Sequence, residues 1–374
     1  MKNNIIVLLV VVLLIIVGLS GCFENKSKNQ TPVKKVTLGE IIYENLTIKD
    51  LNINAESFPK IGSSTSAHPL AILVGCKVLN ISYLWSNEIV FPYQHVKIVG
   101  KNLTYITVSN ITYQNLFIYP RWGYYDTENY LIPNASEPGK EYIAENITNK
   151  VFRSGTHGAY VNLINGSLDL IIVARLPSDD ELELAKNYSV ELVAKSVALD
   201  AFVFILNEMN PIENLTIEQI KAIYTGEIRN WSEVGGENSK INAYQREDNS
   251  GSQELMKTLV MKNLEMIKEE NMIVYTMDGP FNKLINDKFG IAYTVYYYKQ
   301  FMATHYYNVK FCGINGVHPN YETIYSKSYP YTAEVYVVIR KDLNPENNAY
   351  KLRDWLLGTD GQDVVKESGY VPIS

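Results

Sequence analysis

The residues best suited to chemistry form one short run, QREDNSGSQE, at positions 245–254. An extended pattern precedes this run, and apolar residues at roughly helical spacing follow it. The small residues are therefore expected at a helix N-terminus, where unpaired backbone N–H groups and the positive dipole end favour an anion. An arginine nearby can add two parallel hydrogen bonds to an oxyanion. An ordinary helix cap is the alternative interpretation. The candidate residues here are Arg246, Ser250, Gly251 and Ser252.

Two further segments, 62–69 and 153–158, are also rich in Ser, Thr and Gly and also lead into apolar helical patterns. Pro69 suits a first helical turn, and Asn165-Gly166 is a stop signal before a strand pattern at 168–173. Three such helix starts, each after an extended segment, can converge on one tetrahedral anion. Three independent caps are the alternative. The candidate residues here are Thr65, Ser66, Ser154, Gly155 and Thr156.

The elements that must position these residues alternate between strands and helices. Strand patterns at 199–206 and 290–293, with a helical pattern at 216–224 between them, predict an α/β fold. Segment 78–150 breaks this alternation, and we predict a β-rich insertion there. Its expected strands are 96–99, 103–108 and 112–119.

The N-terminus indicates export. The apolar run Ile5–Val17 has the length of a signal-peptide core and is too short for a membrane-spanning helix. It ends in Leu-Ser-Gly-Cys22, which resembles the lipobox of prokaryotic lipoproteins, whose cysteine carries the lipid. We predict a signal peptide at 1–21, lipidation of Cys22 and a polar tether at 22–35, on the extracytoplasmic face of the cell membrane. An uncleaved N-terminal anchor with unmodified Cys22 is the alternative.

Composition limits the partners of this chain. With 374 residues, 46% hydrophobic and 20% charged, it is predicted to be globular and too long for one core, so we expect two lobes. The formal net charge of −6 argues against nucleic acid or an anionic membrane as a nonspecific partner. An anion must therefore be captured by local groups. Cys76 and Cys312 can form one disulfide outside the cell or remain buried thiols.

Two longer stretches carry a family resemblance. NEMNPIENLT at 207–216 and IYTGEIRNWSEVGG at 223–236 are similar to the hallmark of the phosphate-binding lipoprotein family of ABC importers, and the run from Arg246 follows at family spacing. YPYT at 329–332 and GQDVV at 361–365 match as well. The likeness covers about 60–76 and 150–374 and leaves the insertion unaccounted for.

The resemblance implies a two-lobed periplasmic-binding-protein-like fold of type II, in which each lobe is a mixed sheet flanked by helices and the lobes close on the ligand. It implies that phosphate is held by hydroxyls and N–H groups at helix starts and by an arginine, which carries over to the candidate residues above. An ABC permease is the implied partner, and we expect a monomer. We predict lobe 1 at 36–200 plus 310–374 and lobe 2 at 201–309, with crossings near 198–202 and 295–313.

Arg175 departs from the family pattern. Phosphate-selective members resemble one another in an acidic side chain that follows the strand beginning here at Asp169. That acidic side chain accepts the proton that hydrogen phosphate keeps and sulfate lacks. If Arg175 points into the cleft, it replaces that acceptor with a donor and favours a fully ionised anion or a larger phosphorylated or carboxylated ligand. Pairing of a surface Arg175 with Asp179 or Asp180 is the alternative.

Enzymatic and metal chemistry find little support. Ser154 and His157 are close, but Gly-X-Ser-X-Gly and Ser-X-X-Lys motifs are absent, and the five histidines have no metal-ligand spacing. We expect no cofactor and no metal. The sequence therefore predicts a non-enzymatic binding protein that captures an inorganic oxyanion, phosphate first, and delivers it to an ABC importer. The alternative is a non-transport sensor or binding module of the same fold, or a binder of sulfate, molybdate, tungstate or a small phosphorylated or carboxylated metabolite.

Overall fold

The structure is a computed structural model of the 374-residue chain and describes residues 41–42, 51–86, 96–99, 102–105 and 129–373. These residues belong to one unit, 35–374. The predicted signal peptide, Cys22 and the tether lie outside the described residues. Among the residues described, no helix combines the length and the apolar character needed to cross a membrane.

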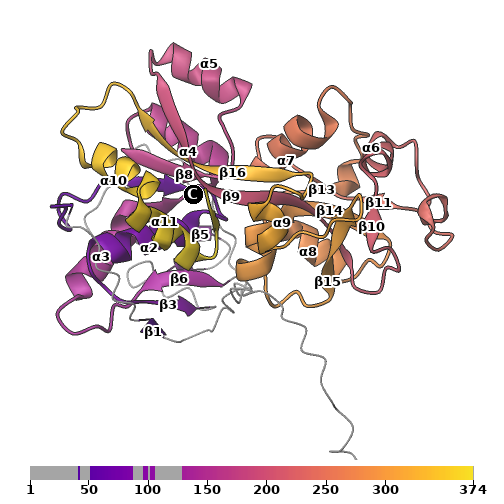
Figure 1. The fold of residues 1–374 in the computed structure, drawn as a ribbon, viewed down its shortest axis with the longest axis horizontal. Helices are drawn as coiled ribbons and strands as arrows, with labels where there is room; N and C mark the ends of the chain where they lie inside the picture. The colour runs from indigo at the N-terminus through magenta and orange to yellow at the C-terminus, as the bar shows by residue number, and fades with distance from the viewer. Residues whose placement is uncertain (1–40, 43–50, 87–95, 100–101, 106–128, 374) are drawn as a thin grey trace, which may run out of the picture. The chain divides into compact units, whose positions relative to one another are not determined.

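The long strand β9 (Leu192–Asn207) joins two groups of elements (Figure 1). Its first half pairs with β16 (Thr332–Arg340), and its second half pairs with β14 (Gly290–Val295) and β15 (Val309–Ile314). We call the elements on the first half lobe 1 and those on the second half lobe 2. The result is one large mixed sheet with helices around it, which confirms the predicted α/β class.

In lobe 1, β2 (Ile61–Ser63) lies between β7 (Val151–Arg153) and β8 (Leu170–Val173), and all three strands are parallel. β8 continues the sheet through antiparallel pairing with β16. All four residues of β8 are buried, as expected for an apolar strand covered on both faces. The carboxyl ends of these parallel strands share one edge, so the segments that follow them start side by side.

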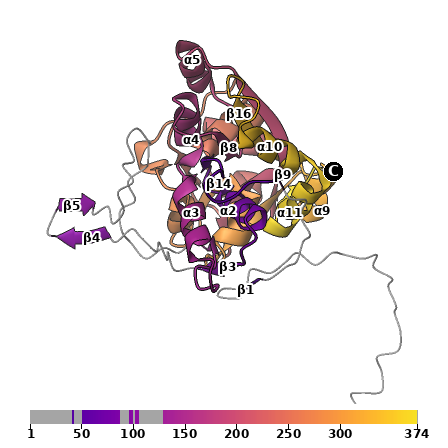
Figure 2. The ribbon, with the colours of Figure 1, turned by 90° about the vertical axis from the view of Figure 1, so that its left-hand side faces the viewer.

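The lobe 1 helices cover this sheet. They are α2 (His68–Val78), α3 (Glu141–Lys150), α4 (Gly155–Ile164), α5 (Asp179–Asn187), α10 (Asn348–Leu357) and α11 (Thr359–Ser368). Helices α10 and α11 lie side by side, and α11 contacts α2 (Figure 2). Because α2 is covered by the sheet, α3 and α11, the run Pro69–Cys76 is buried all round. After α11, β17 (Val371–Pro372) pairs with β9.

The predicted β-rich segment is described in part. β3 (Tyr83–Ser86) pairs with β1 (Ile41–Ile42) and β6 (Tyr130–Pro133), and β4 (Val96–Val99) forms a hairpin with β5 (Asn102–Tyr105). β4 confirms the strand predicted at 96–99. The strand predicted at 112–119 lies outside the described residues.

Lobe 2 consists of short elements around β14 and β15. They are β10 (Asn214–Leu215), α6 (Ile217–Thr225), η1 (Trp231–Val234), β11 (Asn242–Ala243), β12 (Gln245–Arg246), α7 (Gly251–Leu255), η2 (Met256–Met261), η3 (Glu270–Met272), β13 (Ile273–Val274), α8 (Gly279–Leu284), η4 (Tyr298–Met302) and α9 (Tyr321–Tyr325). Local signals set the bounds of α6. Thr216 and Gln219 form a capping box at its start, and Gly226 ends it with φ of 80°.

The chain enters lobe 2 between Ala201, which faces Thr332, and Phe202, which faces Val295. This crossing falls within the predicted 198–202. The pairing of β15 with the second half of β9 favours a return to lobe 1 at Thr332, later than the predicted boundary at 309/310. The domain boundaries drawn from the sequence stay predictions.

The two described cysteines are free and buried. Cys76 lies in α2 of lobe 1, and Cys312 lies in β15 of lobe 2. Burial raises the pKa of the Cys312 thiol to about 12, so this thiol stays protonated at neutral pH. Of the two interpretations of the sequence, the structure has the buried thiols.

Candidate anion-binding site

The starts of α2 and α4 are brought together by the parallel strands before them. Ser63 faces Arg153 across β2 and β7, and the Ser154 N–H donates to the Ser63 carbonyl at 3.3 Å. On the other side of β2, the Ser64 N–H donates to the Ile172 carbonyl at 3.1 Å. Two of the three predicted helix starts therefore lie at one edge of the lobe 1 sheet.

Ser154 has the most informative side chain at this edge. It is the N-cap residue of α4 and is 2% exposed, but its hydroxyl makes no capping bond. The buried Oγ has no hydrogen-bond partner among the described residues. A buried, unpaired hydroxyl is unfavourable, and an anion oxygen at the start of α4 is one partner that would satisfy it.

The α2 start is built differently. The helix begins at His68 with Ala67 as its N-cap, and the Ser64 hydroxyl accepts from the Ala67 N–H at 3.4 Å. Ser66 is buried and Thr65 half-buried. His68 Nδ1 lies 3.0 Å from Ser63 Oγ, so the imidazole contacts the end of β2.

The third helix start lies in lobe 2. Ser250 caps α7 by accepting from the Gln253 N–H at 3.1 Å, and Ser252 in the first turn is buried. The short α7 continues directly into η2, which makes one helical segment from Gly251 to Met261. The sequence signal for this helix start is confirmed.

The starts of α4 and α7 touch across the two lobes. A Cβ atom added to Gly251 would lie 2.6 Å from Thr156 Oγ1 and 3.4 Å from Thr156 Cβ. Only a residue without a side chain allows this approach. The structure thus places Gly155 and Thr156 of lobe 1 beside Gly251 of lobe 2.

Arg246 is buried in lobe 2, at the end of β12. Its Nε donates to the Val274 carbonyl at 3.2 Å, Nη2 donates to the Tyr275 carbonyl at 3.3 Å, and Nη1 lies 3.4 Å from Met277 Sδ. Burial lowers the pKa of the guanidinium, and Glu247, 3.6 Å from Nη2, opposes that shift. Lobe 2 therefore contains, at the end of β12, a buried cation for which an anion would provide further compensation.

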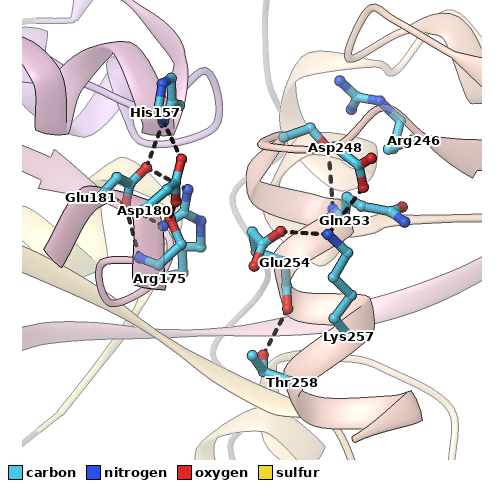
Figure 3. Close-up of polar contacts among 12 residues, drawn as sticks. His157, Arg175, Asp180, Glu181, Arg246, Asp248, Gln253, Glu254, Lys257 and Thr258 are labelled. Atoms are coloured by element: carbon cyan, nitrogen blue, oxygen red, sulfur yellow. Dashed lines mark hydrogen bonds and ion pairs between the residues drawn. The ribbon is translucent and has the colours of Figure 1, made fainter. Parts of the chain in front are cut away.

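Arg175 is buried and directed at a carboxylate (Figure 3). Nη1 and Nη2 donate to the two oxygens of Glu181 at 2.7 and 2.8 Å, and Nη1 also donates to the Leu176 carbonyl. Glu181 is fully buried and belongs to the capping box of α5 with Ser178. The partner of Arg175 is therefore Glu181, rather than the Asp179 or Asp180 of the surface-pair hypothesis.

The same carboxylate holds His157, in the first turn of α4. His157 Nδ1 lies 3.1 Å from Glu181 Oε1 and 3.7 Å from Asp180 Oδ2. The hydrogen bond that His157 donates to Glu181 raises the pKa of His157, although burial opposes the change. These three side chains could together hold a metal ion, but both Glu181 oxygens already accept from Arg175, so a cation would compete with the guanidinium.

Asp200, at the crossing in β9, is a residue that sequence reasoning missed. It is 2% exposed, and its Oδ1 accepts from the N–H groups of Ala201 and Tyr297 at 2.8 and 3.0 Å. Its Oδ2 is buried without a partner in the described part of the chain. Burial raises the pKa of Asp200 to about 7, and the two backbone hydrogen bonds only partly oppose it. A lone acidic residue within the apolar run 197–206 was the available signal.

Comparison with known proteins shows the family. A model described as the PBP superfamily domain matches residues 138–359. The phosphate-binding protein PstS of Borreliella burgdorferi is 27% identical over 218 residues, which cover 56% of this chain and 76% of that protein. PstS of Staphylococcus aureus is 23% identical over 224 residues, covering 59% and 68%.

A solved structure shares the fold. It is described as a putative phosphate ABC transporter substrate-binding protein with bound phosphate from Clostridium perfringens. It superimposes with a TM-score of 0.50 at 23% identity, over 60% of this chain and 87% of that one. Together with the family match over more than half of the sequence, these findings show that the chain belongs to the PBP superfamily, with phosphate-binding PstS proteins among its relatives.

Proposed function

We propose that this protein is an extracytoplasmic substrate-binding protein that captures phosphate between its lobes and delivers it to an ABC importer. The observation that carries the proposal is the buried, unpaired Ser154 hydroxyl at the α4 start, which lies where α4 meets the α7 start of lobe 2. Arg246 supplies a buried positive charge. The PstS relatives are named phosphate-binding proteins, which supports phosphate as the anion.

The proposed ligand contacts are hydroxyls and N–H groups at three helix starts together with the guanidinium. They are Thr65, Ser66, Ser154, Gly155, Thr156, Arg246, Ser250, Gly251 and Ser252. Hydrogen bonds to charged groups contribute about 1.5 to 3 kcal/mol each, and micromolar binding needs only about 8 kcal/mol net. The contacts are therefore sufficient for a transport protein, and no covalent step is required. Anchoring through a lipid on Cys22 and a monomeric state complete the proposal.

Arg175 has a structural role in this proposal. Glu181 neutralises it inside lobe 1, so Arg175 does not add an unpaired charge that would favour a fully ionised anion. We therefore expect phosphate to bind more tightly than sulfate. A larger phosphorylated ligand is disfavoured because Thr156 and Gly251 leave little space between the helix starts.

Thermal unfolding of the anion-stripped chain tests the function. Phosphate at about 100 times its dissociation constant should stabilise the protein by about 2.7 kcal/mol, a shift of several degrees. Sulfate at equal ionic strength should give a smaller shift. No shift with phosphate, or a larger one with sulfate, molybdate or tungstate, would refute phosphate as the ligand.

Ser154→Ala tests whether the buried Ser154 hydroxyl binds phosphate. Loss of one hydrogen bond to an anion should weaken phosphate binding by about tenfold or more, while the ligand-free protein keeps its stability because the lost hydroxyl is unpaired. Calorimetric titration measures the affinity. Ser196→Ala in β9 is the matched control, since Ser196 Oγ is also buried and unpaired but lies beside β16. Equal affinities for the two variants would remove Ser154 from the site.

Gly251→Ala tests the contact between the lobes. The added methyl group would overlap Thr156 Oγ1, and overpacking of this kind costs about 1 to 3 kcal/mol, so phosphate affinity should fall about five- to 100-fold. Small-angle scattering should show a more open protein with phosphate present. At Gly358, the matched control, an added Cβ has its nearest neighbour at 3.4 Å, and Gly358→Ala should leave affinity unchanged. Normal closure of the Gly251 variant would mean that the bound state differs from this contact.

A further inference from the structure

Arg175 keeps one donor that no described residue of lobe 1 satisfies. Its Nη1 and Nη2 both donate to Glu181, but its Nε is buried without a hydrogen-bond partner in the described residues. The side chain is 5% exposed, so water has little access to this N–H group. A buried guanidinium with an idle donor would gain a hydrogen bond from any acceptor that approaches it.

Glu254 of lobe 2 has the charge that this donor requires. It lies in α7, three residues after Gly251, and its Oε1 accepts from Lys257 Nζ at 2.9 Å. Burial lowers the pKa of Arg175, the hydrogen bonds to Glu181 outweigh that effect, and the Glu254 carboxylate raises the pKa further. In Figure 3, Arg175 lies beside Glu181 of lobe 1, and Glu254 lies on helix α7 of lobe 2.

Helix α7, which carries Glu254, already meets helix α4, to which the Arg175–Glu181 pair is bound. Thr156 at the start of α4 touches the position of Gly251 at the start of α7. His157 binds Glu181, which fixes the Arg175–Glu181 pair to the first turn of α4. Because Glu254 lies three residues after Gly251 on α7, a rotation of the lobes about the Thr156–Gly251 contact is the movement that would bring Glu254 to Arg175.

We propose that Glu254 and the Nε–H of Arg175 form an ionic contact between the lobes that holds the closed state around the bound anion. The inference rests on the proposed function and adds a positioning residue to it, since Glu254 acts on closure and is not a ligand of phosphate. Within lobe 2, Lys257 also pairs with Asp248 at 3.0 Å, so Lys257 keeps a partner when Glu254 turns to Arg175.

The test is the rate of phosphate release from the full chain, followed by tryptophan fluorescence in stopped flow. Glu254→Gln should speed release about tenfold and leave association nearly unchanged, because a closing contact acts on the bound state. The release rate of the unchanged chain should rise with salt, and that of Glu254→Gln should rise less. An unaltered release rate in Glu254→Gln would overturn the inference.

Lys257→Met is the matched control. It removes the partner of Glu254 within lobe 2 and should leave release equal or slower. If Lys257→Met speeds release as much as Glu254→Gln does, Glu254 acts within its own lobe and the inter-lobe contact is wrong.

A double variant that lacks the Arg175–Glu181 pair tests whether Glu254 acts through Arg175. Arg175→Met combined with Glu181→Met removes both charges of the buried pair, and His157, the other partner of Glu181, keeps Asp180 at 3.7 Å. In that background Glu254→Gln should change release less than twofold, and a tenfold change would overturn the inference.

Failure of the proposed function is distinguishable from failure of this contact. Absence of phosphate binding by the unchanged chain refutes the function alone. The contact is then judged in the ligand-free chain, where Glu254→Gln should increase the radius of gyration in small-angle scattering. An equal radius for both proteins would refute the contact.

Discussion

Arg246→Ala is expected to weaken phosphate binding by about 100-fold or more. The guanidinium is buried, and hydrogen bonds from a buried charged group to an anion are worth about 2 to 5 kcal/mol when one partner is removed. Burial lowers the pKa of Arg246 because desolvation disfavours the charged guanidinium. A nearby phosphate dianion would stabilise that charge. Calorimetric titration with phosphate measures the loss.

Two variants make the result specific. Arg246→Lys keeps the charge without the planar pair of donors and should retain part of the affinity. Arg229→Ala removes an exposed arginine of lobe 2 and should bind normally. Because Arg246 also donates to the Val274 and Tyr275 carbonyls, thermal unfolding without phosphate must show that Arg246→Ala remains folded. Affinity unchanged in a folded Arg246→Ala protein would refute the shared-site model.

Asp200→Asn is expected to change the pH dependence of stability more than any other single substitution proposed for this chain. Burial raises the pKa of Asp200 from an ordinary value near 3.8 to about 7 in the folded protein. The folded chain therefore holds a proton that the unfolded chain releases between these two values. The contribution of Asp200 to stability is fully present below about pH 4 and is lost as pH rises to about 7. A pKa difference of this size corresponds to about 4 kcal/mol.

Chemical denaturation between pH 4 and 8 measures this effect. As pH rises, the free energy of unfolding of Asp200→Asn should increase relative to that of the unchanged protein, by up to about 4 kcal/mol at pH 8. A constant cost of fitting the amide cancels, because the comparison concerns the change with pH. Asp363→Asn, which replaces an exposed aspartate of α11, serves as the control for an Asp-to-Asn change. Parallel curves for Asp200→Asn would show that Asp200 is ionised throughout.

Hydrogen bonds and ring stacking connect Asp200 at the crossing to the C-terminal segment of the chain. Asp200 Oδ1 holds the Tyr297 N–H, and the Tyr297 ring stacks on Tyr370 with centroids 3.8 Å apart. The Tyr297 hydroxyl donates to the Ser368 carbonyl at the end of α11. Asp200 thus ties the end of β14 to the C-terminal segment of lobe 1, and its ionisation places an unpaired charge at that junction.

The local structure of the candidate site followed from the sequence. Ser250 was expected at a helix start and caps α7, and the Ser-Gly-Thr run from Ser154 leads into α4 as predicted. The apolar run of β8 and the breaking residues after α4 also lie where their patterns placed them. These features depend on neighbours within a few positions along the chain, so residue types and spacing are sufficient to specify them.

The resemblance added the family and its two lobes, which the superfamily match over residues 138–359 bears out. It did not specify Arg175, for which the sequence left two interpretations. The structure has a third arrangement, a buried pair with Glu181, although the capping box of Ser178 and Glu181 was visible as a Ser-X-X-Glu pattern. That pattern predicts a cap and does not reveal that the same carboxylate also neutralises an arginine from the preceding strand end.

The sequence by itself determined the strands and helix starts around the candidate site, the residue that caps α7 and where anion chemistry can occur. Only the tertiary structure decided that α4 meets α7 at Thr156 and Gly251. It also decided that, among the described residues, the buried Ser154 Oγ and Asp200 Oδ2 have no hydrogen-bond partner. The physical reason is the range of the interactions. Caps and periodicity are set by residues close in sequence, whereas burial and charge pairing depend on groups that distant segments of the sheet bring together.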